Sequence, residues 1–296
     1  MSKSIHRWRY VWLIICLSAF QCKKTHLDVP FVPTPYKVVE QMIRMADVKK
    51  DDILYDLGCG DGRIVISAAQ KMGTRGVGVD IDPERIRESR KNAVKARVES
   101  LTKFIEQDLF QTNFSEATVV TMYLLPSVNL KLRPKLMNEL KPGTRVVSHN
   151  FGMSGWLSDK TELVLGDYRL HTLHFWIVPA NVAGVWKMLQ PTDFEKNFYE
   201  LELDQIFQYA QGVLSTKDSQ IPLQDVMLTG ERIQFSVERN GNKGIEAWLF
   251  EGRVSRNSME GQFWVKSGSN ATRNIWKAER DPSTVEPLDM LNRIKP

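Results

Sequence analysis

The sequence predicts an α/β chain: a doubly wound, mainly parallel sheet followed by a small antiparallel β domain. Three observations predict it. Apolar runs of strand length alternate with helical patterns up to about residue 148, a glycine-rich turn joins the first strand to its helix, and residues after 185 alternate with period two. Alternating strands and helices favour a parallel sheet covered on both faces.

The elements follow in order. A helix is expected from residue 34 onward, with Thr34 as its N-cap and Pro35 at the first helical position. The next elements are a strand ending at Asp56, a helix from residue 64, strand 75–80, helix 83–97, strands 101–107 and 117–123, helix 128–140 and strand 144–148. Residues 162–179 then read as two strands without a helix between them, so a hairpin closes the sheet at seven strands.

The remaining chain has a different pattern. Residues 199–204, 233–238, 259–265 and 274–277 alternate between apolar and polar side chains, with turn residues between several of them. The organisation predicted is therefore a sheet domain over 30–180, an antiparallel meander over 185–280 forming a sandwich or partly closed barrel, and a tail over 281–296. Trp248, Trp264 and Trp276 are expected in the core of the second domain.

Residues 1–29 form a separate segment, in which a basic start precedes eleven apolar or small residues at 10–20. This stretch has the shape of a secretory signal and is shorter than the roughly 20 residues of a spanning helix. Two interpretations of this segment stay open. One is a secretory signal, which includes a lipoprotein signal with lipidation at Cys22, and the other is an uncleaved membrane segment. Each predicts a membrane-associated or cell-envelope protein, with the side of the membrane undecided.

Composition narrows the classes of function. The chain is 42% hydrophobic and 25% charged, as soluble globular proteins are. Residues 1–30 hold five basic side chains against Asp28, which leaves only +1 of the net charge of +5 for the rest, so nucleic-acid binding is not expected. Three cysteines make no disulfide framework, and His171 and His174 would face opposite sides of a strand, so no metal is expected.

The turn at residues 56–63, Asp-Leu-Gly-Cys-Gly-Asp-Gly-Arg, carries the strongest functional signal. Gly58, Gly60 and Gly62 allow positive φ angles and leave bare backbone for a nucleotide-like ligand. A dinucleotide fingerprint requires glycine where Arg63 stands, and a P-loop requires Gly-Lys-Ser/Thr. The carboxylate of Asp56 would repel a pyrophosphate and attract an ammonium or sulfonium group, which indicates S-adenosylmethionine.

Further acids follow the next two strands. In a doubly wound sheet, ligands bind beyond the carboxyl ends of the strands. Asp80 lies 18 residues after Gly62, near the ~20 expected of an acid that accepts ribose hydroxyls. Asp108 is placed to accept from the adenine amino group. Ile81 and Leu109, the residues that follow these acids, complete the predicted cofactor site.

Taken in order, segments 30–35, 56–63, 78–80, 107–110, 123–126 and 146–150 resemble the class I methyltransferase family that includes the mitochondrial lysine methyltransferases of the ATP synthase c subunit and of the adenine nucleotide carrier, with their bacterial relatives. The resemblance covers roughly residues 30–180. It implies a seven-stranded Rossmann-like sheet and S-adenosylmethionine-dependent N-methylation of a protein lysine, a membrane protein being one option. It also implies that the loop containing Pro33 and Pro35 closes over the site.

Tyr123, at the end of the fourth strand, is the expected wall of a slot that keeps the acceptor amine neutral. Pro33, Pro35 and Tyr123 therefore form the predicted catalytic set. His149 and Asn150 either face the acceptor or have a structural role. The Asn/Asp-Pro-Pro-Tyr/Phe segment of many nucleobase methyltransferases is replaced by Tyr-Leu-Leu-Pro at 123–126, which disfavours a DNA adenine enzyme.

Two other functions stay open from sequence. One is a methyltransferase acting on a small molecule. The other is an envelope binding protein whose methyltransferase core is no longer catalytic, motivated by the signal-like segment and the tryptophan-bearing second domain.

Overall fold

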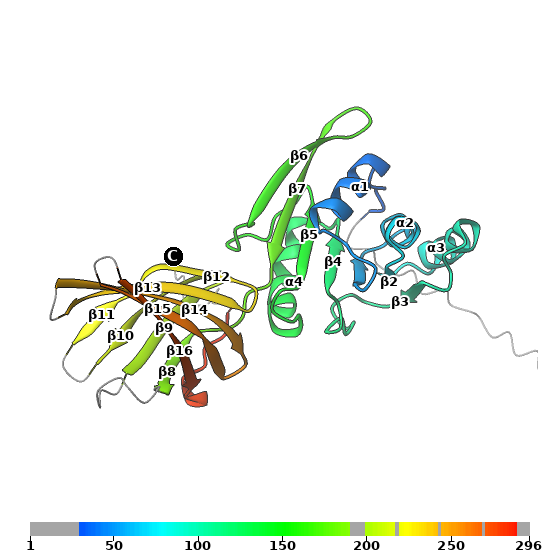
Figure 1. Cartoon of the computed structure of the whole chain (residues 1–296). Coiled ribbons are helices and arrows are strands. Elements are labelled where there is room, and N and C mark those ends of the chain that lie inside the picture. The colour runs from blue at the N-terminus through cyan, green and yellow to red at the C-terminus, as the bar shows by residue number, and fades with distance from the viewer. Residues whose placement is uncertain (1–29, 190–198, 217–218, 242–243, 268–269, 289–296) are drawn as a thin grey trace, which may run out of the picture.

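The computed structural model describes residues 30–189, 199–216, 219–241, 244–267 and 270–288. The segment 1–29 and the last part of the expected tail, 289–296, lie outside this range. The first half contains α1 (Tyr36–Met45), β1 (Ile53–Leu57), α2 (Arg63–Met72), β2 (Arg75–Asp80), α3 (Pro83–Ala96), β3 (Thr102–Glu106), β4 (Val119–Met122), α4 (Pro126–Glu139), β5 (Arg145–His149), β6 (Lys160–Leu165) and β7 (Leu170–Ile177). Figure 1 shows these elements in one α/β body.

The first sheet has seven strands in the order β3-β2-β1-β4-β5-β7-β6. Its first five strands are parallel, and β7 runs antiparallel to both β5 and β6. This confirms the predicted doubly wound sheet closed by a hairpin. The order reverses between β1 and β4, and such a reversal opens a ligand-binding crevice at the carboxyl ends of the strands.

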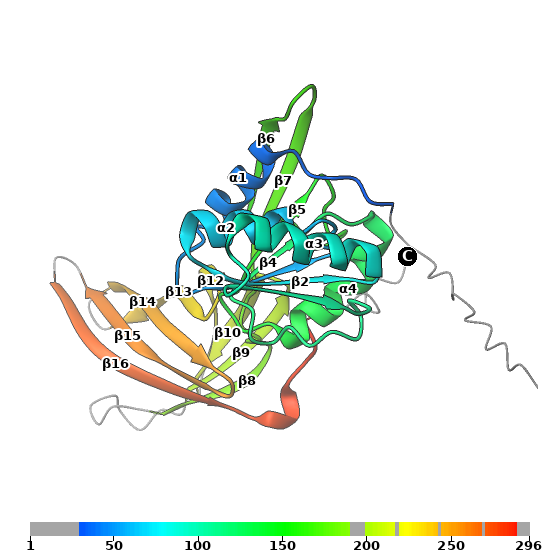
Figure 2. The same ribbon diagram turned by 90° about the vertical axis from the view of Figure 1, so that its right-hand side faces the viewer.

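Both faces of this sheet are covered (Figure 2). Apolar residues of α1, α2 and α3 pack with Leu54, Val119 and Val147 on one face. Residues of α4 pack with Leu57 and Val120 on the other. Strand side chains alternate between faces, so each strand contributes to both cores.

Thr34 is not an N-cap. Helix α1 begins at Tyr36, its N-cap is Pro35, and no side chain caps it. The hydroxyl of Thr34 is instead 3.0 Å from Nδ1 of His149, on β5. The Thr34 hydroxyl therefore bonds a residue distant in the sequence instead of capping the helix.

The second sheet has nine antiparallel strands and curves into a near-barrel. Its members are β8 (Gly184–Leu189), β9 (Tyr199–Ile206), β10 (Tyr209–Ser215), β11 (Gln220–Pro222), β12 (Gln224–Thr229), β13 (Arg232–Gly241), β14 (Gly244–Ser255), β15 (Ser258–Ser267) and β16 (Asn270–Arg280), followed by a 3-10 turn at Pro282–Thr284. Its order is β11-β10-β9-β8-β16-β15-β14-β13-β12. The structure thus adds five strands to the four that alternation revealed.

Aromatic side chains fill the core of the near-barrel. Trp248 and Trp276 are buried there, as predicted. The prediction for Trp264 is wrong: it is only partly buried and lies outside that core. Neighbouring residues on a strand face opposite sides, so burial of Phe263 turns Trp264 outward, opposite the exposed Leu249.

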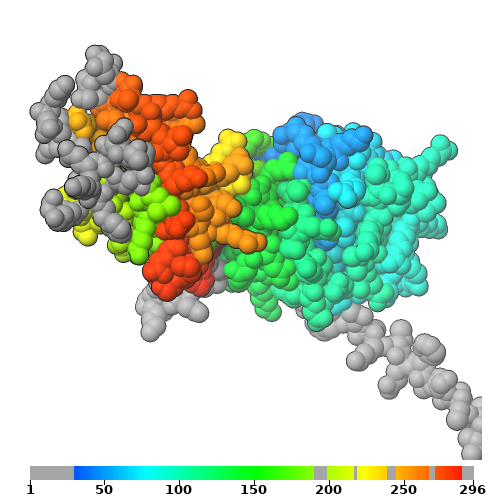
Figure 3. All heavy atoms as spheres, turned by 60° about the horizontal axis from the view of Figure 1, so that its bottom comes forward, coloured from blue at the N-terminus to red at the C-terminus, as the bar shows by residue number. Residues whose placement is uncertain are grey.

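The two sheets pack together through the turn between β9 and β10. Phe207 in this turn is buried in the α4-side core of the first sheet. Its ring stacks on Trp156 with centroids 6.2 Å apart, and the Arg133 guanidinium lies 5.0 Å from its centroid. Nearby, Gln208 donates to the carbonyl of Leu157 at 2.7 Å. Figure 3 shows the β8–β16 region in close contact with the α/β body.

We expect Phe207→Ala to lower the free energy of unfolding by about 3–5 kcal/mol, because it removes a buried ring between the two sheets. Tyr209→Ala, at the 57% exposed first residue of β10, is the matched control and should change stability by under about 1 kcal/mol. Chemical denaturation followed by tryptophan fluorescence measures both. Equal, small losses in the two variants would show that Phe207 does not join the sheets.

Candidate functional site

A pocket lies at the carboxyl ends of the parallel strands, where the strand order reverses. Residues 30–35 are here called the strap, and the first five of them, 30–34, close one side of the pocket. Its lining includes eight of the predicted site residues: Pro33, Asp56, Gly58, Asp80, Ile81, Asp108, Leu109 and Tyr123. Gly60, Gly62 and Pro35 are absent from the lining. No lining residue comes from the described strands of the second sheet.

The three glycine positions of the turn have no room for a side chain. Gly58, Gly60 and Gly62 have φ angles of 80°, 53° and 79°. A Cβ on Gly58 would lie 2.7 Å from Leu124, and one on Gly60 would lie 2.3 Å from Phe31. The predicted requirement for glycine is thus met, although Gly60 lies beneath Phe31 and Gly62 faces α3 and β3.

Asp56 is the buried acid of the pocket, with only 2% of its surface exposed. The Thr121 hydroxyl donates to it at 2.8 Å. Burial raises the pKa of Asp56 to about 7, and the neighbouring charges of Asp80 and Asp61 act in the same direction. A cationic ligand would stabilise its ionised form.

Asp80 and Asp108 are fixed by backbone donors. Asp80 accepts from the backbone N–H of Gly60 at 2.8 Å and of Asp82 at 2.9 Å. Asp108 accepts from that of Phe110 at 2.8 Å. Each carboxylate oxygen keeps a further lone pair for a ligand donor. Bare glycine backbone and three acids together suit a cationic nucleoside such as S-adenosylmethionine and would repel a pyrophosphate.

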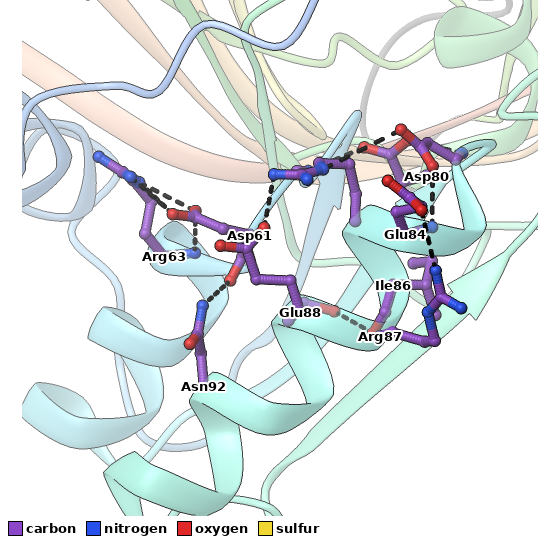
Figure 4. A network of polar contacts seen from close by, with 12 residues as sticks. Asp61, Arg63, Asp80, Glu84, Ile86, Arg87, Glu88 and Asn92 are labelled. Atoms are coloured by element: carbon purple, nitrogen blue, oxygen red, sulfur yellow. Dashed lines mark hydrogen bonds and ion pairs between the residues drawn. The ribbon is translucent and has the colours of Figure 1, made fainter.

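The strap is fastened to the glycine turn by Arg63. Its guanidinium forms an ion pair with Asp61 at 2.6 Å and donates to the carbonyl of Thr34 at 2.9 Å. Figure 4 shows Asp61 between Arg63 and Asn92, whose side chain donates to the Asp61 carbonyl. The sequence offered one signal for this role: arginine stands at the position that a dinucleotide fingerprint reserves for glycine.

Phe31 adds an apolar clamp that the sequence did not reveal. Its ring covers Gly60, and the guanidinium of Arg85 lies 4.8 Å from its centroid. The strap therefore bridges the glycine turn and the start of α3.

Tyr123 occupies the other side of the pocket, at the end of β4. Its ring lies on His149 with centroids 3.9 Å apart, and its hydroxyl accepts from Nδ2 of Asn150 at 3.3 Å. Asn150 has a φ of 64° and exchanges backbone and side-chain hydrogen bonds with Thr172. Tyr123 is thus held by the residues that end β5.

His149 is fully buried and has partners on both nitrogens. Nδ1 is 3.0 Å from the Thr34 hydroxyl and Nε2 is 2.7 Å from Nδ1 of His171. Burial lowers the pKa of His149 to about 3, and charges of His171 and Arg169 add to this. The ring is therefore neutral and supports Tyr123 from behind, which favours the structural alternative for His149.

His171 is buried beside His149, whereas His174 lies beside Trp176 on the opposite face of β7. The described residues contain no cluster of His, Cys, Asp and Glu that could hold a metal ion.

The sequence is similar to methyltransferases of known type. Residues 56–160 match the family described as the ANTKMT methyltransferase domain. A protein-lysine N-methyltransferase of Saccharolobus islandicus is 49% identical over 151 residues, which are 51% of this chain and 94% of that protein. The human lysine N-methyltransferase of the ATP synthase c subunit is 35% identical over 131 residues, 44% of this chain and 55% of its own length.

One similar solved structure is described as an RNA methyltransferase from Salinibacter ruber in complex with S-adenosyl-L-homocysteine. It is 50% identical to this chain, with a TM-score of 0.49, and the match covers 56% of this chain and all of that one. The chain spans about half the length of the human relative and nearly all of the Saccharolobus one. On the Saccharolobus match and the pocket described above, the chain belongs to the family of ANTKMT-type methyltransferases, enzymes that take their methyl group from S-adenosylmethionine.

Proposed function

We propose that this methyltransferase methylates the side-chain amine of a protein lysine. The Saccharolobus and human relatives are both named lysine N-methyltransferases, which supports this acceptor. The observation that carries the proposal is the position of Tyr123, which lines the pocket beside its acids and is backed by a buried, neutral histidine. An aromatic wall of this kind desolvates an amine and so favours its neutral, nucleophilic form.

We assign the methyl donor to the glycine turn and the three acids. Bound S-adenosylmethionine supplies a methyl group on a sulfonium, which an amine takes by in-line displacement. In this assignment Gly58 provides bare backbone, Asp56 neutralises positive charge, and Asp80 and Asp108 accept from the ribose and the adenine. Ile81 and Leu109 line the same pocket.

The protein's contribution to the reaction is alignment and exclusion of water. The strap, with Pro33 in the lining and Pro35 at the start of α1, covers the pocket. Tyr123 and the backbone of Leu124 and Leu125 orient the amine. Correct placement of the amine accounts for much of the rate, since a misplacement of about 1 Å can lower the rate about a hundredfold.

Binding of S-adenosylmethionine should depend on the ionisation of Asp56. Its pKa in the folded protein, about 7, lies above the ordinary 3.8. Between these values the folded chain keeps a proton that the unfolded chain releases, so this group makes the protein less stable as pH rises from about 4 to 7. Affinity for the cationic donor should rise over pH 6–8, by at most about tenfold per unit.

Titration calorimetry on the wild type and Asp56→Asn at pH 6 and 8 measures this dependence. The variant should bind more weakly at pH 8 and show a smaller difference between the two pH values. Comparing the two proteins cancels the titration of the donor itself. Identical pH dependence in both would remove Asp56 from the assigned role.

The acceptor can be identified by methyl labelling. Enzyme and labelled donor are incubated with the protein, RNA and small-metabolite fractions of a cell extract, and labelled protein is hydrolysed to detect methyl-lysine. Tyr123→Ala should lower the rate about a hundredfold through misplacement, whereas Tyr123→Phe, which keeps the ring, should lose under about tenfold. Label confined to RNA or metabolites would contradict a lysine acceptor.

We also propose that residues 1–29 hold the enzyme at a membrane, either as an uncleaved segment or through a lipid at Cys22. The basic residues and the apolar stretch 10–20 support this. In the described part of the chain, none of the helices is long and apolar enough to cross a bilayer. On this proposal, the full chain should sediment with membranes and a variant lacking residues 2–22 should not; a full-length chain in the supernatant would contradict the proposal.

A further inference from the structure

The β6–β7 hairpin extends beyond the carboxyl edge of the sheet, past the acceptor side of the pocket. His149, the last residue of β5, lies opposite Leu173, so residues 165–170 lie beyond the end of β5. Figures 1 and 2 show this hairpin projecting from the α/β body, away from the second sheet.

The two faces of the hairpin differ. One packs against α1, where Gln41 bonds Glu162 and where His171 is buried. The other presents Leu163, Leu165 and Leu170, which are 68%, 65% and 61% exposed. Leu165 and Leu170 are paired in the strand register, so they lie side by side on this face.

These three leucines and Tyr168 at the tip, which is 99% exposed, are here called the leucine stripe. Their exposure shows that nothing in the described residues covers them. Contiguous exposed apolar side chains on a soluble domain mark a site of interaction. Between Leu163 and Leu170 the charged residues are Asp167 and Arg169 at the tip, and the Lys160–Glu162 ion pair of β6 lies at the positions that face α1. An apolar partner therefore fits the stripe better than a charged one.

The hairpin that carries the stripe is joined to the acceptor side of the pocket. The backbone N–H of Asn150 donates to the Thr172 carbonyl at 2.6 Å, and Asn150 also holds the Tyr123 hydroxyl. On the α1-facing side of the hairpin tip, where His171 lies, a Cβ on Gly166 would be 3.4 Å from Pro35 of the strap. A molecule whose amine reaches Tyr123 from this edge would therefore pass beside the hairpin that carries the leucines.

We propose that the leucine stripe binds an apolar segment of the protein substrate, next to its target lysine. This rests on the proposed lysine acceptor and deepens it: the substrate presents leucine-like side chains near the methylated residue. The activity itself requires an acceptor at this edge of the sheet, which favours the substrate over other occupants.

The test uses two synthetic peptides of equal length, each with one lysine. In one peptide the lysine is flanked by leucine and alanine, and in the other it is flanked by serine and glutamine. The variant is Leu165→Lys with Leu170→Glu, which removes apolar surface and keeps an opposite-charge pair across the strands. Ile275→Glu, at a 66% exposed position of the second sheet, is the matched control.

We expect the wild type and Ile275→Glu to have a KM about tenfold lower for the leucine-flanked peptide, since burying even one leucine accounts for such a factor. The double variant should lose this preference, with its kcat on the polar peptide and its affinity for S-adenosylmethionine unchanged. Equal KM values for the two peptides in the wild type, or an unaltered preference in the double variant, would overturn the inference.

Two other occupants have distinct outcomes. Sedimentation showing a wild-type dimer that the double variant breaks, with peptide KM unchanged, would assign the stripe to a second copy. Binding to phosphatidylcholine vesicles that the variant loses, again with KM unchanged, would assign it to a lipid surface. If neither peptide nor cellular protein is methylated by enzyme that binds the donor, the lysine acceptor itself is wrong, which separates that failure from failure of the stripe.

Discussion

The buried carboxylate of Asp56 is the constraint around which the pocket is built. It lies near the end of the inner strand β1 and has one hydroxyl partner. Burial raises its pKa, and two further acids close to it add to this rise. Burying a charge without a counter-charge is costly, so this group favours a cationic ligand or a proton. The other features of the site bring such a ligand to it: bare backbone at Gly58, and acids at the ends of β2 and β3.

The strap contacts both the donor side and the acceptor side of the site. Arg63 ties the Thr34 carbonyl to the glycine turn, on the donor side. The Thr34 hydroxyl reaches His149, which contacts both His171 and Tyr123 on the acceptor side. Thr34 of the strap thus contacts both sides. The position of the strap, Tyr123 and the hairpin are coupled through His149, by its hydrogen bonds to Thr34 and His171 and its ring contact with Tyr123.

The second sheet is remote from this chemistry. It contacts the first body through Phe207 and near Gly143, which precedes β5 and so lies at the amino end of the parallel strands. The pocket opens at the opposite, carboxyl end. The second sheet therefore contributes stability or contacts of its own. The surface that borders the acceptor is the β6–β7 hairpin.

The sequence by itself determined the sheet, its closing hairpin and the order of the acids, because alternation of strands and helices places all carboxyl ends of parallel strands at one edge. It also located the glycine turn, whose backbone conformation depends on local residue type. Only the tertiary structure decided the distant partners of Thr34, Arg63 and His149, which lie 22 to 115 residues away along the chain. It alone turned Trp264 outward and left the leucines of β6 and β7 uncovered, because burial depends on which elements meet in space.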